Sequence, residues 1–167
     1  MHNAEPDRRM LGVLLRQPLR ALLTEIHEGM ALAGYPDLRP AHSAVFMNLD
    51  SKGTRITDLA ERAQMTKQSM GALVKYLESR GYVSTASHPH DGRAKVVRLT
   101  AKGRATEEPA RRNIGRVREK WSRRLGPGEM EEFMRLLRKL NDTIASGGTN
   151  THFSGPSRRS TYNIGTS

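Results

Sequence analysis

Polar side chains on one predicted helix have the chemistry needed to contact a nucleic-acid duplex. The spacing of apolar residues predicts a helix over Lys67–Arg80, whose opposite face carries Gln68, Gly71, Ala72, Lys75 and Ser79. A glutamine amide can pair bidentately with the edge of adenine, and a lysine ammonium can pair with a phosphate. The same pattern fits an ordinary amphipathic helix with a solvated polar face. The helix alone leaves both interpretations open.

The preceding segment supplies a partner that would position this helix. A first helix is predicted over Thr57–Ala63 with Thr57 as its N-cap, and Gln64–Met65 form a short turn. Thr66 is predicted to cap the second helix, which Gly81 ends. The buried stripe of the second helix is predicted to comprise Met70, Leu73, Val74 and Leu77. Two helices joined this way are typical of a helix-turn-helix.

Two strands are predicted to follow the second helix. They cover Tyr82–Ser87 and Ala94–Leu99, and His88–Arg93 between them reads as a loop because it contains an Asp91-Gly92 pair. Arg93, at the tip of that loop, could insert its guanidinium into a narrow minor groove. A helix-turn-helix followed by a hairpin is the order of a winged helix-turn-helix, a fold that chiefly reads duplex DNA.

Several of these motifs resemble those of the multiple antibiotic resistance regulator (MarR) family of transcriptional regulators. The resemblance extends from about Leu11 to Ile144 and is carried by Asp91–Arg93, Val97–Gly103, Leu73–Val83, Leu125–Met130 and Leu136–Leu140. It implies a mainly α-helical fold with a small β wing, in which dimerisation helices flank the DNA-binding module. Together with the groove chemistry, it leads us to expect DNA contacts from Thr66, Lys67, Gln68, Ser69, Ala72, Lys75, His90, Asp91, Arg93 and Lys95.

The charge of the chain is concentrated on the predicted module and the helix after it. The 167 residues carry 28 basic and 17 acidic side chains, a net charge of +11. Arg55–Leu99 has eight basic and four acidic residues (+4), and Thr100–Arg124 has nine and three (+6), whereas Met1–Thr54 balances six against six. This distribution favours a polyanionic partner. A general enrichment of arginine in the source genome would also raise the charge.

Apolar stripes on the flanking segments predict further helices with more apolar surface than the module needs. Arg8–Gly34 reads as a long helix that Pro18 interrupts, Arg39–Leu49 as a short one, and Pro109 is expected to bend the helix after the wing. Gly126–Gly128 breaks that helix before the last one. These stripes either cover the module within one chain or pair with a second copy, and the resemblance implies a homodimer. We expect dimerisation segments at 1–37 and 101–146, the winged module at 38–100, and a flexible tail at 147–167.

The resemblance also implies a small-molecule cleft between the dimerisation helices and the DNA module. In this chain the cleft could be lined by Met30, Tyr35, His42, Phe46 and Met47. The same residue types serve equally well as plain core. The sequence does not determine the effector, the operator or the direction of regulation.

Other classes of function find little support in the sequence. Without cysteine, no disulfide, cysteine-based zinc site or thiol switch is possible, and the His88, His90 and Asp91 cluster is a weak metal signal. No catalytic motif and no cofactor-binding motif occurs. No apolar run approaches a membrane span of about 20 residues and the N-terminus lacks a signal-peptide core, so a cytoplasmic, nucleoid-associated protein is expected. Two hypotheses remain: a sequence-specific regulator, in the form of a repressor released by an effector, or a non-specific architectural DNA-binding protein.

Overall fold

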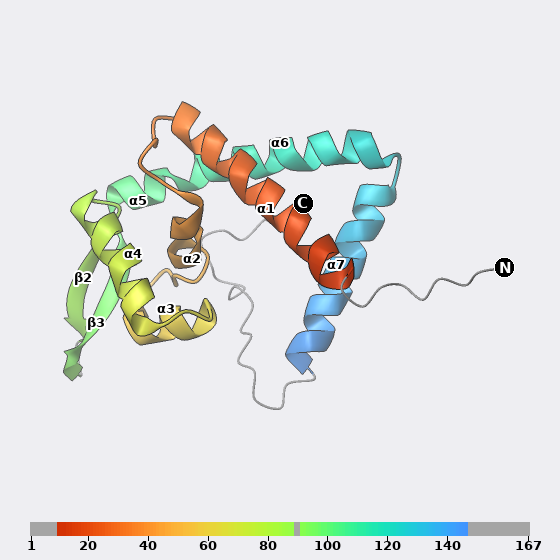
Figure 1. The fold of residues 1–167 in the computed structure, drawn as a ribbon. Helices are drawn as coiled ribbons and strands as arrows, with labels where there is room; N and C mark the ends of the chain where they lie inside the picture. The colour runs from red at the N-terminus through yellow and green to blue at the C-terminus, as the bar shows by residue number, and fades with distance from the viewer. Residues whose placement is uncertain (1–9, 89–90, 147–167) are drawn as a thin grey trace.

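The computed structural model describes residues 10–88 and 91–146, without the side chains of 88–94. Its helices are α1 (Met10–Leu32), the 3-10 turn η1 (Pro40–His42), α2 (Ser43–Phe46), α3 (Ile56–Arg62), α4 (Lys67–Ser79), α5 (Ala101–Ala105), α6 (Glu107–Leu125) and α7 (Glu129–Ser146). Its strands are β1 (Thr54–Arg55), β2 (Val83–His88) and β3 (Asp91–Leu99). The strands group with α2, α3 and α4 at one side, and α1, α6 and α7 extend away from them (Figure 1). The predicted mainly α-helical fold with a small β wing is confirmed.

The sheet has three antiparallel strands in the order β1-β3-β2. Val83 pairs with Leu99 at the base of the wing, and Thr54 pairs with Val97 on the other side of β3. The strand β1 is absent from the sequence prediction because two residues are too few to show an alternating pattern. Its pairing ties the start of the helix-turn-helix to the wing.

The connection between the wing strands is shorter than predicted. His88 pairs with Asp91, and the register shifts between Ser87 and His88. The prediction of a loop over His88–Arg93 is therefore wrong, since Asp91, Gly92 and Arg93 belong to β3. A two-stranded ribbon that projects beyond the core exposes both faces, so polar residues can continue a strand that their composition does not reveal.

The first helix of the pair begins one residue earlier than predicted. Arg55 occupies the N-cap position with an extended backbone (φ −66°, ψ 146°), and α3 starts at Ile56. The prediction of Thr57 as the N-cap is wrong, and the Thr57 hydroxyl instead hydrogen-bonds the Asp58 carboxylate at 3.1 Å. The strand pairing of Thr54 and Arg55 fixes where the helix can begin.

Both ends of α4 form as the sequence predicts. The Thr66 hydroxyl oxygen accepts a hydrogen bond from the Ser69 backbone N–H at 3.1 Å and so caps the helix. Gly81 follows the helix with φ +75°, a left-handed conformation that glycine adopts without a steric penalty. The polypeptide therefore reverses into β2 directly after α4.

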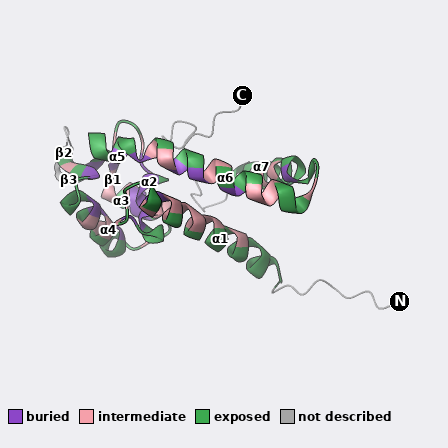
Figure 2. Ribbon diagram, turned by 90° about the horizontal axis from the view of Figure 1, so that it is seen from above, coloured by how far each residue is buried: buried purple, intermediate pink, exposed green. Residues whose placement is uncertain are grey.

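The core lies where α2, α3, α4 and the sheet meet (Figure 2). In the predicted stripe of α4, Met70, Val74 and Leu77 are buried and Leu73 is half-buried against the same cluster. The other buried apolar side chains of the cluster include Val45, Leu49, Leu59, Val83 and Val97. An aliphatic core of this kind holds α4 by one face only.

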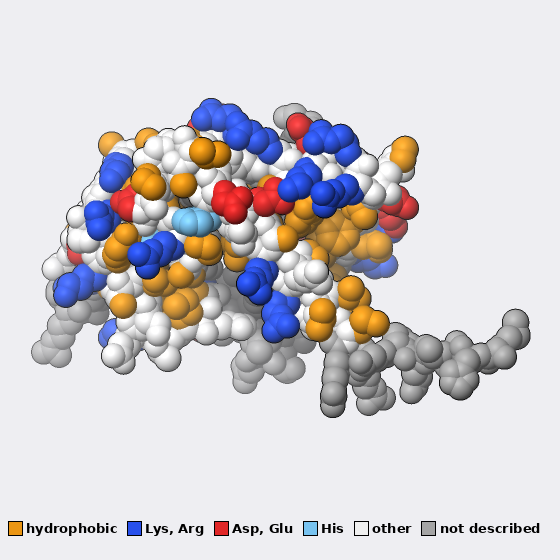
Figure 3. Space-filling view, turned by 45° about the horizontal axis from the view of Figure 1, so that its top comes forward, with side chains coloured by type: hydrophobic (Ala, Val, Ile, Leu, Met, Phe, Trp, Pro, Cys, Tyr) orange, Lys and Arg blue, Asp and Glu red, His pale blue; other side chains and the backbone are white. Residues whose placement is uncertain are grey.

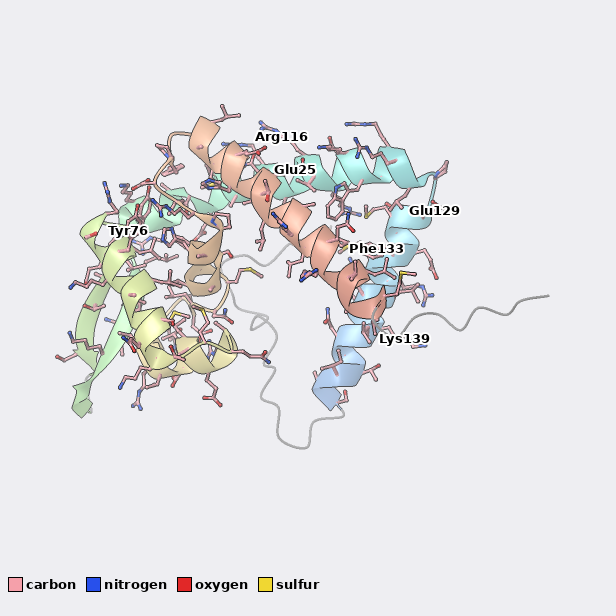
Figure 4. The ribbon with its side chains drawn as sticks, in the orientation of Figure 1. Glu25, Tyr76, Arg116, Glu129, Phe133 and Lys139 are labelled. Atoms are coloured by element: carbon pink, nitrogen blue, oxygen red, sulfur yellow. The ribbon has the colours of Figure 1, made fainter. Side chains whose placement is uncertain are left out.

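The long helices α1 and α6 pack directly on one another. The Lys120 ammonium and the Glu25 carboxylate form an ion pair at 2.9 Å, and Figure 4 places Glu25 beside α6. A side chain at Gly29 would collide with Asn113, so glycine allows the helices to approach closely there. The helix α1 runs unbroken through Pro18, so the prediction that this proline interrupts the helix is wrong.

The segment after the wing is divided differently from the prediction. A break at the fully buried Thr106, whose hydroxyl donates to the Gly103 carbonyl at 2.7 Å, separates α5 from α6. Pro109 lies in the first turn of α6, where proline is tolerated, so the predicted bend at that residue is wrong. The predicted break at Gly126–Gly128 is confirmed, with positive φ at Gly126 and Gly128.

Two apolar faces lack cover within the described part of the chain. The first half of α1 is mostly exposed in Figure 2, and hydrophobic side chains gather where α1 begins in Figure 3. The exposed apolar residues there are Met10, Leu11, Val13, Leu14, Leu15 and Leu19, and those near or on α7 are Leu125, Phe133, Leu136, Leu140 and Ile144. Among the described helices, none is both long and apolar enough to cross a bilayer.

Candidate nucleic-acid interface

One side of α4 gathers all of the contact residues that the sequence predicts for that helix. Met70, Val74 and Leu77 point into the core, so the remaining face is left to solvent. The exposed residues are Thr66, Lys67, Gln68, Ser69, Ala72 and Lys75. This arrangement offers an amide near the N-terminal end of the helix and an ammonium about two turns further on.

Two of these residues also build the helix terminus. The Thr66 hydroxyl donates to the Ser69 hydroxyl at 2.8 Å, in addition to accepting from the Ser69 backbone. Next to them, a Cβ atom built on Gly71 would meet nothing within 4 Å, so the surface around it is open. A small residue here lets the backbone of α4 lie close to a flat or grooved partner.

Of the contact residues predicted on the wing, the structure describes the side chain of Lys95. Lys95 is exposed on β3. Asp91 and Arg93 lie on the same strand by their backbone, but their side chains are outside the described part of the structure. His90 lies outside the described residues. The wing therefore carries a basic residue at Lys95 on the strand that returns to the core.

A contact that the sequence does not predict fixes the wing relative to α4. One carboxylate oxygen of Glu78 accepts hydrogen bonds from the Thr85 backbone N–H at 2.8 Å and from the Thr85 hydroxyl at 2.6 Å. On the other edge of β3, the Arg98 guanidinium donates to the Lys52 carbonyl at 3.0 Å. In the sequence, Glu78 reads as an ordinary charge on a helix surface, and no signal links it to β2.

A second unpredicted contact joins the end of α4 to the segment that leaves α1. The Tyr82 hydroxyl donates to the Asp37 carboxylate at 2.6 Å, and the Tyr76 hydroxyl donates to the Asp37 carbonyl at 3.0 Å. The Lys102 ammonium lies 4.1 Å from the centroid of the Tyr82 ring and donates to the Arg80 carbonyl at 2.8 Å. Four side chains and the Arg80 carbonyl therefore meet at this point.

The electrostatics of this cluster favour a charged Asp37 and a neutral Tyr82. Burial alone would raise the pKa of the Asp37 carboxyl, but the hydrogen bond from Tyr82 and the nearby Lys102 and Arg80 hold that pKa below its ordinary value. Burial, and then the hydrogen bond to Asp37, raise the pKa of the Tyr82 hydroxyl well above its ordinary value. The phenol therefore stays a hydrogen-bond donor throughout the physiological range.

The residues expected to line an effector cleft lie mostly in the packed interior. Met30 and Phe46 belong to the core cluster, and Tyr35 packs against it. His42 is buried and accepts a hydrogen bond at Nδ1 from the Arg39 backbone N–H at 2.9 Å. Its ring stacks on that of Tyr76, with the ring centroids 4.7 Å apart. Met47 is exposed. The structure thus brings four of the five to the region between α1 and the module, and leaves Met47 at the surface.

The described residues contain no cluster of three or more histidine, cysteine or acidic side chains that could hold a metal ion. Lys and Arg side chains are instead distributed across the face in Figure 3, interleaved with hydrophobic side chains. Several of the arginines on α6 and α7 form ion pairs with neighbouring glutamates, such as Arg118 with Glu131 at 3.7 Å. Exposed pairs of this kind contribute little stability.

Comparison with known proteins places this fold among transcriptional regulators. Residues 37–94 match the sequence profile of the MarR family. The HTH-type transcriptional repressor Rv2887 of Mycobacterium tuberculosis is 30% identical over 130 residues, which cover 78% of this chain and 87% of that protein. The crystal structure of MarR has the same fold at a TM-score of 0.73, with 20% identity over 81% of this chain and 98% of that one. CouR from Rhodococcus jostii RHA1, solved with bound p-coumaroyl-CoA, matches at a TM-score of 0.65 and 20% identity over 84% and 94%.

Proposed function

The chain belongs to the MarR family of winged helix transcriptional regulators, and from this premise we propose that it represses transcription by binding a specific duplex site as a homodimer. The exposed face of α4 is the observation that carries the proposal. Gln68 and Lys75 are exposed there about two turns apart, with the small residues Gly71 and Ala72 between them. An amide for base edges, an ammonium for phosphate and a close backbone approach are the requirements of a recognition helix in a major groove.

The second candidate is a non-specific architectural DNA-binding protein, which the net charge of +11 also supports. Charge alone gives sequence-independent affinity. The exposed Gln68 favours the specific reader, because its amide can hydrogen-bond a phosphate but can also pair bidentately with the edge of adenine, which an ammonium cannot distinguish in this way. The wing residues His90, Asp91, Arg93 and Lys95 are proposed to contact the flanking backbone and minor groove.

The apolar faces of α1 and α7 support the homodimer. Leu11 and Leu14 are 65% and 60% exposed, which is costly for leucine side chains on a helix without a partner. We assign 1–37 and 101–146 to dimerisation and 38–100 to DNA binding, with 147–167 outside the described residues. A two-fold pair of these chains would place two α4 helices about one DNA turn apart, roughly 34 Å.

Release by a small molecule is proposed to act in the region between α1 and the module. The residues assigned to it are Met30, Tyr35, His42, Phe46 and Met47. CouR, which has this fold, was solved with p-coumaroyl-CoA bound, so aromatic acyl thioesters and their free acids are suitable first probes. Their effect is measured as dissociation of a labelled duplex from the protein. Dissociation by a probe that leaves a His42→Leu variant bound would support the assignment.

The central experiment is selection of bound duplexes from a random pool, followed by sequencing. A specific dimeric reader should enrich an inverted repeat whose half-sites are centred about 10 base pairs apart. The enriched site should be preferred over random duplex by on the order of a thousand-fold or more. A pool that binds without enrichment would favour the architectural protein instead.

A further inference from the structure

The recognition helix α4 packs one face on the core through Met70, Val74 and Leu77, and its hydrogen bonds to other described segments lie at its C-terminal end. Its C-terminal end makes polar contacts with three other segments, through Tyr76, Glu78 and Arg80. Its N-terminal end, with Lys67, Gln68 and the rest of the exposed face, projects away from these contacts (Figure 1). The core packing holds α4 by its buried face, and the polar contacts at its C-terminal end therefore contribute to the direction in which its N-terminal end points.

One residue contributes two of the bonds at that end. Asp37 accepts from Tyr82 through its carboxylate at 2.6 Å and from Tyr76 through its carbonyl at 3.0 Å. It lies in the connection between α1 and η1, 39 and 45 residues away from these two tyrosines in the chain. Tyr76 is on the last turns of α4, on the side of that connection (Figure 4). Asp37 thus accepts hydrogen bonds both from the recognition helix, through Tyr76, and from Tyr82, the residue before β2 of the wing.

The rings around Asp37 are themselves packed in fixed positions. Tyr82 is 1% exposed and contacts Tyr35 and Phe46 at centroid distances of 6.2 Å and 6.5 Å. Tyr76 stacks on the buried His42 at 4.7 Å. Because the rings cannot move independently, a change in the position of the Asp37 backbone would be transmitted to α4 and β2 together.

We propose that Asp37 is a positioning residue for DNA recognition, which orients α4 and the wing relative to α1 through its bonds to Tyr76 and Tyr82. The inference rests on the proposed function, since it assumes that α4 reads a duplex. The helix α4 is about 20 Å long, at 1.5 Å per residue. A tilt of roughly 5° about its C-terminal end therefore moves its N-terminal end by about 1.7 Å. A shift of that size removes a base-edge hydrogen bond and leaves phosphate attraction almost unchanged.

The test compares binding of the full-length chain to a duplex selected from a random pool and to random duplex. Asp37→Ala and Tyr82→Phe are each expected to weaken binding to the selected duplex about tenfold and to leave binding to random duplex unaffected. Coupling between two residues in direct contact with one another is typically of this size. The double variant should be no weaker than either single variant. Asp37→Asn retains a carboxamide oxygen that can accept from Tyr82, so it should restore most of the preference.

Asp50→Ala is the matched control. It also removes a half-buried carboxylate, but within the described part of the chain that carboxylate accepts from the Arg62 guanidinium of α3 at 2.9 Å and makes no hydrogen bond to α4 or β2. It should lower stability without changing the preference for the selected duplex. Unfolding midpoints of all variants are measured in parallel, and Tyr82→Phe supplies the result if Asp37→Ala does not fold.

Equal losses on both duplexes, additive losses in the double variant, or an unchanged preference would each overturn the role of Asp37. A wild-type chain that shows no preference between the duplexes would instead contradict the proposed function itself. The two failures are therefore distinguished by the wild-type measurement alone.

Discussion

Individual side chains on the exposed face of α4 have separable tasks in DNA binding. Gln68 lies near the N-terminal end of the helix, which approaches base edges in this kind of motif, and Lys75 lies about two turns later. An amide distinguishes bases by its pattern of donor and acceptor, whereas an ammonium attracts any phosphate. Specificity and affinity should therefore depend on different residues of the same helix.

Gln68→Ala is expected to reduce discrimination between the selected site and single-base changes of it by about 1–3 kcal/mol. Lys75→Ala should weaken all duplexes alike and lower the slope of log affinity against log salt by about one unit. Both are measured by titration with labelled duplexes at several salt concentrations. A uniform loss for Gln68→Ala, together with altered base preference for Lys75→Ala, would reverse the assignment.

The buried His42 should make stability depend on pH. Burial, then the nearby Arg39, lower the pKa of the His42 imidazole from 6.5, with a further lowering from His27 and an opposing effect of Asp37. The unfolded chain then binds a proton more readily than the folded one, so stability is fully present above pH 6.5 and declines as the pH falls below it. Protonation at Nδ1 would also remove the acceptor for the Arg39 N–H.

His42→Gln should flatten this decline between about pH 7 and pH 5, as measured by urea unfolding at a series of pH values. The wild-type chain supplies the reference slope, since the other histidines are common to both proteins. An identical pH dependence in the two proteins would show that His42 titrates equally in the folded and unfolded chains.

At the scale of elements, the short helix α5 is packed unusually closely on Tyr82, the residue before β2. A Cβ atom at Gly103 would collide with the Tyr82 carbonyl, whereas one at Gly115, in the middle of α6, would meet nothing within 4 Å. Thr100 caps α5 by accepting from the Gly103 backbone N–H at 3.1 Å. The approach of these two segments depends on the missing side chain at Gly103.

Gly103→Ala is accordingly expected to lower the free energy of unfolding by about 1–3 kcal/mol, because the backbone must shift to relieve the clash. The matched substitution Gly115→Ala, in an open helical position, should raise it by up to about 1 kcal/mol. Denaturant unfolding of both variants measures the difference. Equal changes in the free energy of unfolding at the two positions would mean that α5 does not lie this close to Tyr82.

How far the sequence predicts each element depends on how local its signal is. The ends of α4 are predictable because Thr66 and Gly81 act within one turn of the helix, and its apolar stripe comprises four residues at helical spacing. The strand β1 and the start of α3 are not predictable in this way, because both depend on pairing with β3, far along the chain. The exposed residues of α4 follow from the stripe opposite them.

The contacts that orient these elements have no local signal at all. Asp37 and Tyr82 are 45 residues apart, and each alone reads as a common surface or core residue. The strand assignment of Asp91–Arg93 also escapes prediction, because a projecting ribbon needs no apolar alternation. Sequence therefore predicts which face could bind DNA, and the structure adds what holds that face in place.

At the scale of the whole molecule, the exposed apolar residues should determine the oligomeric state. Leu140 on α7 is 46% exposed among other apolar residues, and Met47, outside the segments assigned to dimerisation, is 45% exposed. Leu140→Asp should dissociate a dimer built on α1 and α7, since it places a charge in a desolvated interface. Met47→Asp serves as the control and should leave the dimer intact. Sedimentation at micromolar concentration measures both, and a monomeric wild-type chain would rule out the dimer.

The account as a whole is tested most directly by the spacing of the two halves of the selected site. A dimer with two recognition helices requires the half-sites on the same face of the duplex. Inserting about five base pairs between them should reduce binding to that of a single half-site, and inserting about ten should place them on one face again. Unchanged affinity for the five-base-pair insertion would contradict a two-fold reader that uses both copies of α4.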